Sequence, residues 1–455
     1  MRPTRLVLLA LVVLGVGAYI VLVERHAPTT DELAERKDKL FATLDQEAAR
    51  RVVVDNSHGH FELEKQGTEW RLTAPVADDA REGAVTSLLS SLRFLKAERT
   101  LDVAGLSLKE YGLDPPALSV TVTDDKGGAF TLKLGGELPL GNTRAAITDG
   151  KKVFIVNKYI ASDLDRDLAG WRSDQLVQVW SSDVAALTVV SPAGRVALAH
   201  SGSVWTLTEP LADLADRDRA EGLVSDINAA RIKEFLDGQP DLAALGLTTP
   251  RAEVTIVRKD KPPVKLEFGL ERDQDGAKQV ACRRGERVFW VDANAAARTQ
   301  TPPEQWRSPY LVRLDTWAVE QLEITAGGAS AKLERKDGQW RAAGGEVDSA
   351  AVSRRLNTLA DLKVVRFDVA RPTGDPIGTV KATTSDGTVV EASFFPAAAA
   401  GERVAVVPGR AGALAVDAAR VAELLEDPAA LAAPRPTPSP AGTPSGKASG
   451  SGSGG

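Results

Sequence analysis

Two histidines near the start of the chain are close enough in sequence to be considered as a metal-binding pair. His58 and His60 flank Gly59, and imidazole nitrogen is a common zinc ligand. A zinc site needs at least three protein ligands, and nothing in the sequence brings His26 or His200 to this pair. The pattern therefore favours a polar hairpin turn, and we expect no bound metal.

An acidic segment superficially matches a calcium-binding loop. Asp163, Asp165 and Asp167 alternate along the chain, and Asp174 stands at position twelve of the possible loop. Position six of such a loop is glycine because the backbone turns sharply there, but this chain has Leu168 at that position. We therefore interpret the segment as a solvated helix surface.

Residues for covalent catalysis and phosphate binding are poorly represented. The chain contains no G-x-S-x-G and no S-x-x-K motif, and Cys282 is its only cysteine. One cysteine excludes an internal disulfide, and without a nearby histidine it is typical of an inert, buried thiol. The segment 442–447 resembles a phosphate-binding loop but is one residue short and has no flanking strand or helix. We expect no enzymatic activity and no cofactor.

One spacing of about 135 residues recurs across separate blocks of the chain. Segment 67–75 recurs at 202–210, and segment 171–177 recurs at 306–312. A third copy, shorter and more divergent, is aligned at the same interval by Leu333. A constant interval across separate blocks is the signature of internal duplication. The length of 455 residues is therefore divided among three repeats.

The repeat also bears on the eight tryptophans, which could otherwise be interpreted as stacking platforms for sugars. Most of them occupy two repeated positions, namely Trp70, Trp205 and Trp340, and Trp171 and Trp306. An aromatic ring present at the same position of successive copies is most simply a core anchor, because it buries a large apolar area. Trp290 and Tyr310 are not required by the repeat, so they remain candidates for a binding cleft.

Each copy predicts short strands, one helix and then more strands. The predicted strands are Val52–Val54, Phe61–Lys65, the segment around Trp70, Leu118–Thr123 and Phe130–Leu134, with later counterparts at Ala252–Val257 and Val264–Phe268. Strand runs around one helix predict an α+β fold class, with a mostly antiparallel sheet and a covering helix in each unit.

The helix is predicted from an apolar stripe at helical spacing. In the three copies the stripe is Val85, Leu88, Leu89, Leu92 and Leu95; then Ala220, Leu223, Val224, Ile227 and Ala230; then Val352, Leu356, Leu359 and Leu362. We expect Asp78 or Asp79 to be the N-cap of the first helix, since aspartate is a preferred N-cap residue.

The N-terminus predicts a transmembrane anchor. Leu6–Val23 contains no charged residue, and its 18 residues span about 27 Å as a helix, enough to cross the hydrocarbon core. Arg2 and Arg5 precede it, so the positive-inside rule places the N-terminus in the cytoplasm and the rest of the chain in the periplasm. A cleaved signal peptide with small residues at Val16–Ala18 is the alternative.

The expected domains follow from the repeat and from composition. In chain order they are a cytoplasmic N-terminus with the membrane anchor (1–26), a juxtamembrane connector (27–44), repeats at 45–178, 179–313 and, in degenerate form, 314–432, and a disordered Pro/Gly/Ser-rich tail (433–455). The net charge of −6 argues against a nucleic-acid-binding protein, which would show a basic face.

The repeated blocks resemble a bacterial family of membrane-anchored repeat proteins, domain-of-unknown-function family DUF4340. The resemblance rests on Gly67-x-x-Trp70-Arg71-Leu72-Thr73-x-Pro75, on Tyr111–Pro116, on Gly135-Gly136 before Pro139, and on the connector Pro28–Glu32. It covers residues from about 45 to 312, and the third copy lacks two of these blocks.

Members of that family are often encoded beside ABC-type transport systems, so the resemblance implies an envelope or transporter partner and no catalytic residues. We therefore expect an inner-membrane protein whose three repeats form a non-catalytic periplasmic scaffold. Repeat proteins present long surfaces suited to partners. The alternative is a module that binds an envelope glycan or lipid in an aromatic-lined cleft, with Trp290 as its best residue.

Overall fold

The computed structural model describes residues 39–433 except 105, 140 and 398. The anchor expected over Leu6–Val23 and nearly all of the expected tail lie outside these described residues. Within residues 39–433, no helix combines the length and apolar character needed to cross a membrane. The chain separates into two compact bodies, one ending at Asp174 and the other beginning at Gln175.

Between residues 39 and 174, the described part of the first body contains one nine-stranded sheet and three short or medium helices. Its strands are β1 (Ala49–Asn56), β2 (Gly59–Gln66), β3 (Glu69–Ala74), β4 (Asp78–Asp79), β5 (Arg99–Asp102), β6 (Leu118–Asp124), β7 (Ala129–Glu137), β8 (Thr143–Ile147) and β9 (Lys152–Asn157). Its helices are α3 (Glu82–Phe94), α4 (Ile160–Leu164) and α5 (Leu168–Trp171).

The second body contains two further nine-stranded sheets. The second repeat has β10 (Val184–Ser191), β11 (Gly194–Ser201), β12 (Val204–Glu209), β13 (Asp213–Leu214), β14 (Ile232–Phe235), β15 (Ala252–Arg258), β16 (Val264–Gln274), β17 (Ala277–Arg284) and β18 (Arg287–Asp292). Its helical segments are η2 (Ser181–Asp183), α6 (Arg217–Ala229), α7 (Asn294–Ala297), η3 (Arg298–Gln300) and η4 (Pro303–Trp306).

The third repeat repeats this pattern without losing a strand. It has β19 (Val319–Ala326), β20 (Ala329–Lys336), β21 (Gln339–Ala342), β22 (Gly345–Glu346), β23 (Val364–Val369), β24 (Gly378–Thr384), β25 (Val389–Pro396), β26 (Glu402–Val406) and β27 (Ala413–Asp417). Its helices are α8 (Ser349–Ala360), α9 (Ala418–Leu425) and α10 (Pro428–Leu431). The copy that is degenerate in sequence is therefore complete in fold.

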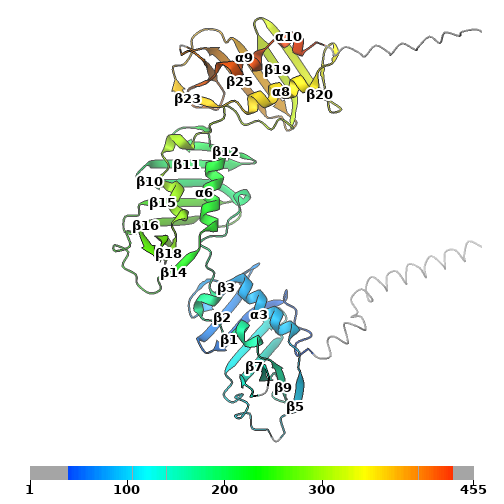
Figure 1. The fold of residues 1–455 in the computed structure, drawn as a ribbon, viewed down its shortest axis with the longest axis vertical. Coiled ribbons are helices and arrows are strands. Elements are labelled where there is room, and N and C mark those ends of the chain that lie inside the picture. Colours follow the sequence, from blue (N-terminus) through cyan, green and yellow to red (C-terminus); the bar gives the residue numbers. More distant parts are fainter. Residues whose placement is uncertain (1–38, 105, 140, 398, 434–455) are drawn as a thin grey trace, which may run out of the picture. The chain divides into compact units, whose positions relative to one another are not determined.

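The strand order is the same in all three sheets. The first sheet runs β4-β3-β2-β1-β6-β7-β8-β9-β5, and the equivalent strands follow the same order in the other two. Neighbouring strands pair antiparallel, as β1 does with β2 and with β6. The strands before and after each main helix, such as β4 and β5, lie at opposite edges of the sheet. The helix between them therefore crosses one face (Figure 1).

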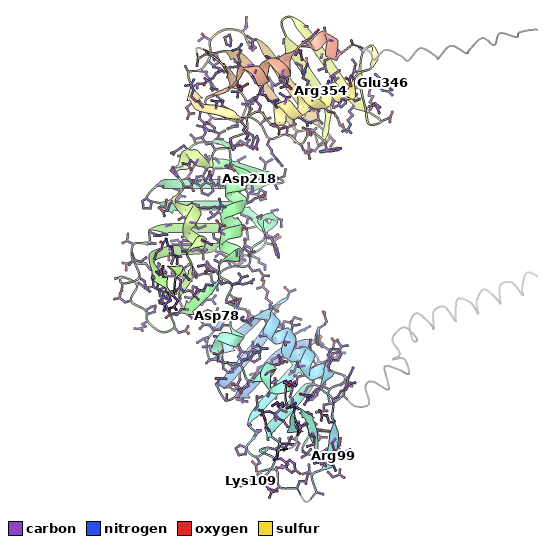
Figure 2. The ribbon with its side chains drawn as sticks, in the orientation of Figure 1. Asp78, Arg99, Lys109, Asp218, Glu346 and Arg354 are labelled. Atoms are coloured by element: carbon purple, nitrogen blue, oxygen red, sulfur yellow. The ribbon has the colours of Figure 1, made fainter. Side chains whose placement is uncertain are left out.

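The core of each repeat lies between the sheet and this helix. All residues of the three predicted apolar stripes are buried, which confirms them. Strand side chains alternate in burial, so that Val52 and Val54 of β1 are buried and their neighbours are not. Exposed charges such as Asp218 on α6 and Arg354 on α8 occupy the other side of the helices (Figure 2).

The predicted N-cap of the first helix is wrong. Asp78 and Asp79 form β4, and α3 begins later, with Arg81 at a cap position that lacks a side-chain hydrogen bond. The Asp78 carboxylate instead accepts hydrogen bonds from Arg172 at 2.9 and 2.6 Å. Asp78 therefore forms a buried ion pair and does not cap the helix.

Candidate functional site

The predicted histidine pair lies in the β1–β2 hairpin, as its turn residues indicated. His58 is exposed in the turn, and His60 lies on β2. His60 Nδ1 is 2.7 Å from Asp55 Oδ1, and its Nε2 is 3.1 Å from Glu62 Oε1. The hydrogen bond to Asp55, followed by that to Glu62, raises the pKa of His60. The two ring nitrogens face different carboxylates, so this arrangement is an exposed ion-pair cluster.

The residues of the possible calcium loop each have a different partner. Asp163 accepts hydrogen bonds from Ser87 and Ser91 of α3 at 2.8 and 2.5 Å. Asp165 accepts one from Ser57 at 2.8 Å, and Asp167 caps α5. Across the described ranges, no group of three or more His, Cys, Asp and Glu side chains is arranged to hold a metal ion.

Cys282 lies in the core of the second repeat. It is fully buried on β17, among residues such as Phe268 and Phe289. Burial raises the pKa of its thiol far above the ordinary value. A protonated and inaccessible thiol is a poor nucleophile, so Cys282 is a core residue.

The repeated tryptophans are core anchors, as predicted. Their exposed fractions do not exceed 5 %, for Trp70, Trp205, Trp340, Trp171 and Trp306. Trp290 is also buried, with the guanidinium of Arg272 4.1 Å from its ring centroid. It is therefore not available for stacking on a ligand. Tyr310 is 38 % exposed.

The repeated Gly-Leu block attaches a loop to the sheet. Leu113 is buried in a small second cluster with Ala145, Ile147 and Val153, and Leu247 occupies the equivalent position in the second repeat. Gly135 passes so close to this loop that a Cβ there would overlap the carbonyl oxygen of Tyr111. Glycine is required because the two backbones are in contact.

A buried aspartate–arginine pair accompanies the repeated Trp-Arg motif. Asp78 pairs with Arg172 in the first repeat, and Asp213 pairs with Arg307 in the second, at 2.6 and 2.5 Å. All four side chains are at most 4 % exposed. The third repeat has Gly345 at the equivalent position of its edge strand, where it lies opposite Ala342.

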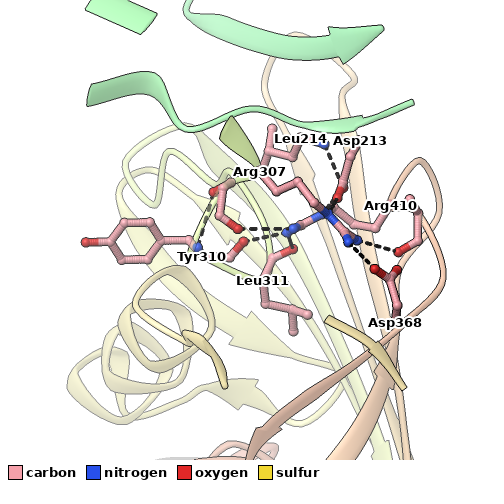
Figure 3. Close-up of polar contacts among 9 residues, drawn as sticks. Asp213, Leu214, Arg307, Tyr310, Leu311, Asp368 and Arg410 are labelled. Atoms are coloured by element: carbon pink, nitrogen blue, oxygen red, sulfur yellow. Dashed lines mark hydrogen bonds and ion pairs between the residues drawn. The ribbon is translucent and has the colours of Figure 1, made fainter. Parts of the chain in front are cut away.

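Asp213 also binds an arginine from the third repeat. Arg410 lies in the loop between β26 and β27, and its Nε donates to Asp213 Oδ1. The backbone N–H of Leu214 donates to the same oxygen at 2.8 Å, and Arg307 Nε donates to Oδ2 at 2.5 Å. The buried carboxylate is thus compensated by three donors (Figure 3).

The other guanidinium nitrogens of the two arginines also donate hydrogen bonds. Arg307 Nη1 donates to Asp368 at 2.6 Å, and its Nη2 donates to the carbonyl of Ala411 at 2.9 Å. Arg410 donates through Nη1 and Nη2 to three backbone carbonyls, those of Tyr310, Leu311 and Ser308. Burial lowers the pKa of Arg410. We call Asp213, Arg307, Asp368 and Arg410 the arginine exchange.

A groove of about 650 Å³ lies over the polar face of the third sheet. Opposite charges face each other across its strands, because Glu323 lies opposite both Lys332 and Lys381, and Glu334 lies opposite Arg341. The Lys332 ammonium is 3.0 Å from Glu323. Paired charges across neighbouring strands stabilise a sheet surface. The lining has a basic excess, since Glu323 and Glu334 are its acidic residues and Lys332, Lys336, Lys381 and Arg341 its basic ones.

Sequence reasoning missed the arginine exchange. Asp78 and Asp213 are 135 residues apart, as are Arg172 and Arg307. This repetition of opposite charges was a usable signal for an ion pair. Arg410 had no such signal, because it is separated from Asp213 by 197 residues and lies in the most divergent copy.

Comparison with known proteins agrees with the internal repeat. The family model of a domain of unknown function, DUF4340, matches residues 70–241 and again 205–379. Together these matches run from β3 of the first repeat, through the second repeat, to the start of β24 in the third. The same comparisons found no matching curated protein and no matching solved structure. The chain belongs to the DUF4340 family.

Proposed function

We propose that this protein is a non-catalytic scaffold anchored in the inner membrane, with its repeats in the periplasm, and that it serves an envelope or ABC-type transport complex. The supporting observation is the role of the repeated residues. The tryptophans fill the cores, and the Gly-Leu block attaches a loop to the sheet. The buried pair of Asp213 and Arg307 lies where the second repeat meets the third. What has been kept during duplication is therefore the construction of the units.

Repetition of one structural unit suits a protein that presents surface to partners. Each repeat places one sheet face against its helix and leaves the other face with polar residues, such as Arg51 and Glu62 in the first repeat. Conserved construction with divergent surfaces would let the three units contact different proteins. The family resemblance suggests that those proteins belong to a transport system.

The partner proposal is tested by site-specific photocrosslinking in intact cells followed by purification from solubilised membranes. A photoreactive residue at exposed Ser225 of α6 or Asn357 of α8 samples the helix side of two repeats. A residue at Thr206 or Thr383 samples the polar sheet faces. We expect envelope or transporter proteins to be captured from one side of the sheets. Failure to capture any such protein at all four positions would contradict the proposal.

The location is tested separately with a membrane-impermeant maleimide. Cys282 is buried and is the only natural cysteine, so an exposed cysteine introduced by Ser225→Cys is the reactive site. We expect it to be labelled when only the outer membrane has been permeabilised. Labelling that requires disruption of the inner membrane would place the repeats in the cytoplasm and exclude the proposed orientation. The unsubstituted chain is the control for labelling at Cys282.

A further inference from the structure

The connector between the second and third repeats is hydrogen-bonded to both of them. The Ser308 N–H donates to the carbonyl of Leu214 in the second repeat at 2.8 Å. The next residue, Pro309, accepts from the Val364 N–H of the third repeat, also at 2.8 Å. Two successive residues are therefore bound to two different repeats. Domains that move independently are joined by flexible linkers crossed by few contacts, and this connector is of the opposite kind.

The arginine exchange crosses the same joint in both directions. Arg307 extends from the second repeat to Asp368 and to the Ala411 carbonyl in the third. Arg410 extends from the third repeat to Asp213 in the second. The guanidinium of Arg307 also lies 4.2 Å from the ring centroid of Phe367. Each repeat supplies one arginine to an acidic residue of the other.

Burial makes these contacts hard to open one at a time. The side chains of Asp213, Arg307 and Arg410 are 0, 2 and 3 % exposed. A buried charge that loses its partner remains desolvated and uncompensated, which is strongly unfavourable. A change of angle at the joint would separate Arg410 from Asp213 and Arg307 from Asp368 together.

We propose that the arginine exchange locks the second and third repeats into one rigid body, so that a partner meets their surfaces at a fixed mutual orientation. This goes beyond the proposed scaffold role, because the rigid connection does not depend on which partner binds or on which side of the membrane the repeats lie. It also agrees with the division of the chain, in which both repeats belong to one compact body. The lock requires Arg410 and is supported by Asp368.

The proposal is tested by double electron–electron resonance on the full-length protein. Spin labels on Ser225→Cys in α6 and Asn357→Cys in α8 report the distance between the two repeats, and buried Cys282 stays unlabelled. We expect one narrow distance distribution, as narrow as that of two labels within a single repeat. A broad distribution in the otherwise unsubstituted protein would overturn the proposal.

The substitution Arg410→Gln removes the charge that enters the second repeat and should broaden the distribution at least twofold. Arg366→Gln is the matched control, because Arg366 pairs with Glu402 at 2.6 Å within the third repeat and is 57 % exposed. It should leave the width unchanged. An Arg410→Gln protein that is folded by circular dichroism yet keeps the narrow distribution would contradict the lock.

A second variant keeps the test decisive if Arg410→Gln does not fold. Asp368 is 62 % exposed, so Asp368→Asn leaves the buried core intact and should broaden the distribution by a smaller amount. The distribution of the parent protein should also be unchanged in 1 M NaCl, because buried ion pairs are screened much less than exposed ones. Broadening by salt alone would show that surface charges, not the buried exchange, hold the joint.

Discussion

At the scale of single residues, the repeated positions fall into two kinds with different physical roles. The tryptophans act through area, since a buried aromatic ring removes a large apolar surface from water. The aspartate–arginine pairs act through charge. Both partners must be present, because a buried charge that has lost its partner destabilises the fold. Substitutions of the two kinds should therefore have different consequences.

Trp171→Ala should destabilise the first body by about 3–5 kcal/mol, the usual cost of truncating a buried aromatic residue. Trp171 is completely buried, whereas Trp317 is 83 % exposed. Trp317→Ala is the control and should change stability by less than about 0.5 kcal/mol. Urea unfolding followed by circular dichroism measures both. Equal effects of the two substitutions would show that burial is not what the repeated tryptophan contributes.

His60 should make stability depend on pH. Its pKa is raised above the ordinary 6.5, first by Asp55 and then by Glu62. The stabilisation is therefore complete below about pH 6.5 and is lost as pH rises through the raised pKa. Since His60 is half exposed, His60→Gln should cost on the order of 0.5 kcal/mol at pH 5.5 and less at pH 9.

The measurement is urea unfolding at the two pH values, with His58→Gln in the same turn as the control. Within the part of the chain that the structure describes, the side chain of His58 forms no ion pair. A His60→Gln effect that is larger at pH 9 than at pH 5.5 would contradict the sign derived from the pKa.

At the scale of elements, the sequence predicted those parts whose signal is local. The helices were recovered because Val85, Leu88 and their neighbours repeat at helical spacing, and strands such as β6 because their residues alternate. The edge strand β4 was missed because two residues show no periodicity, and its Asp78 was interpreted as a helix cap. The joint was missed because its partners meet only through tertiary structure.

The loop attached by the Gly-Leu block offers a test at this scale. Gly135→Ala should destabilise the first body by about 1–3 kcal/mol, because its new Cβ would overlap the Tyr111 carbonyl and force the two backbones apart. The adjacent Gly136 has nothing within 4 Å of its Cβ position, so Gly136→Ala should be close to neutral. Thermal unfolding of the two variants gives the comparison. A neutral Gly135→Ala would mean that the loop does not pack against the sheet as described.

At the scale of the whole molecule, cooperativity should follow the two compact bodies and not the three repeats. Each repeat has its own hydrophobic core, and the second and third repeats, which form one body, are also joined by the arginine exchange. Calorimetry of the full chain should show two transitions. Arg410→Gln should divide the second transition in two, because it removes about 3 kcal/mol of coupling between the repeats. The unfolding temperature of the less stable repeat should then fall by on the order of 5–10 °C. Three transitions in the parent protein would contradict this view.

The pairing of Asp213 with Arg307 inside one repeat has a consequence for how such a chain can grow. The two charges compensate each other before any third charge arrives, so a newly duplicated copy need not supply an arginine at once in order to fold. An arginine that arises afterwards at the place of Arg410 would then bind a carboxylate that is already compensated. Gene duplication could therefore lengthen the chain one viable step at a time, and each new joint could become rigid after the copy itself had been retained.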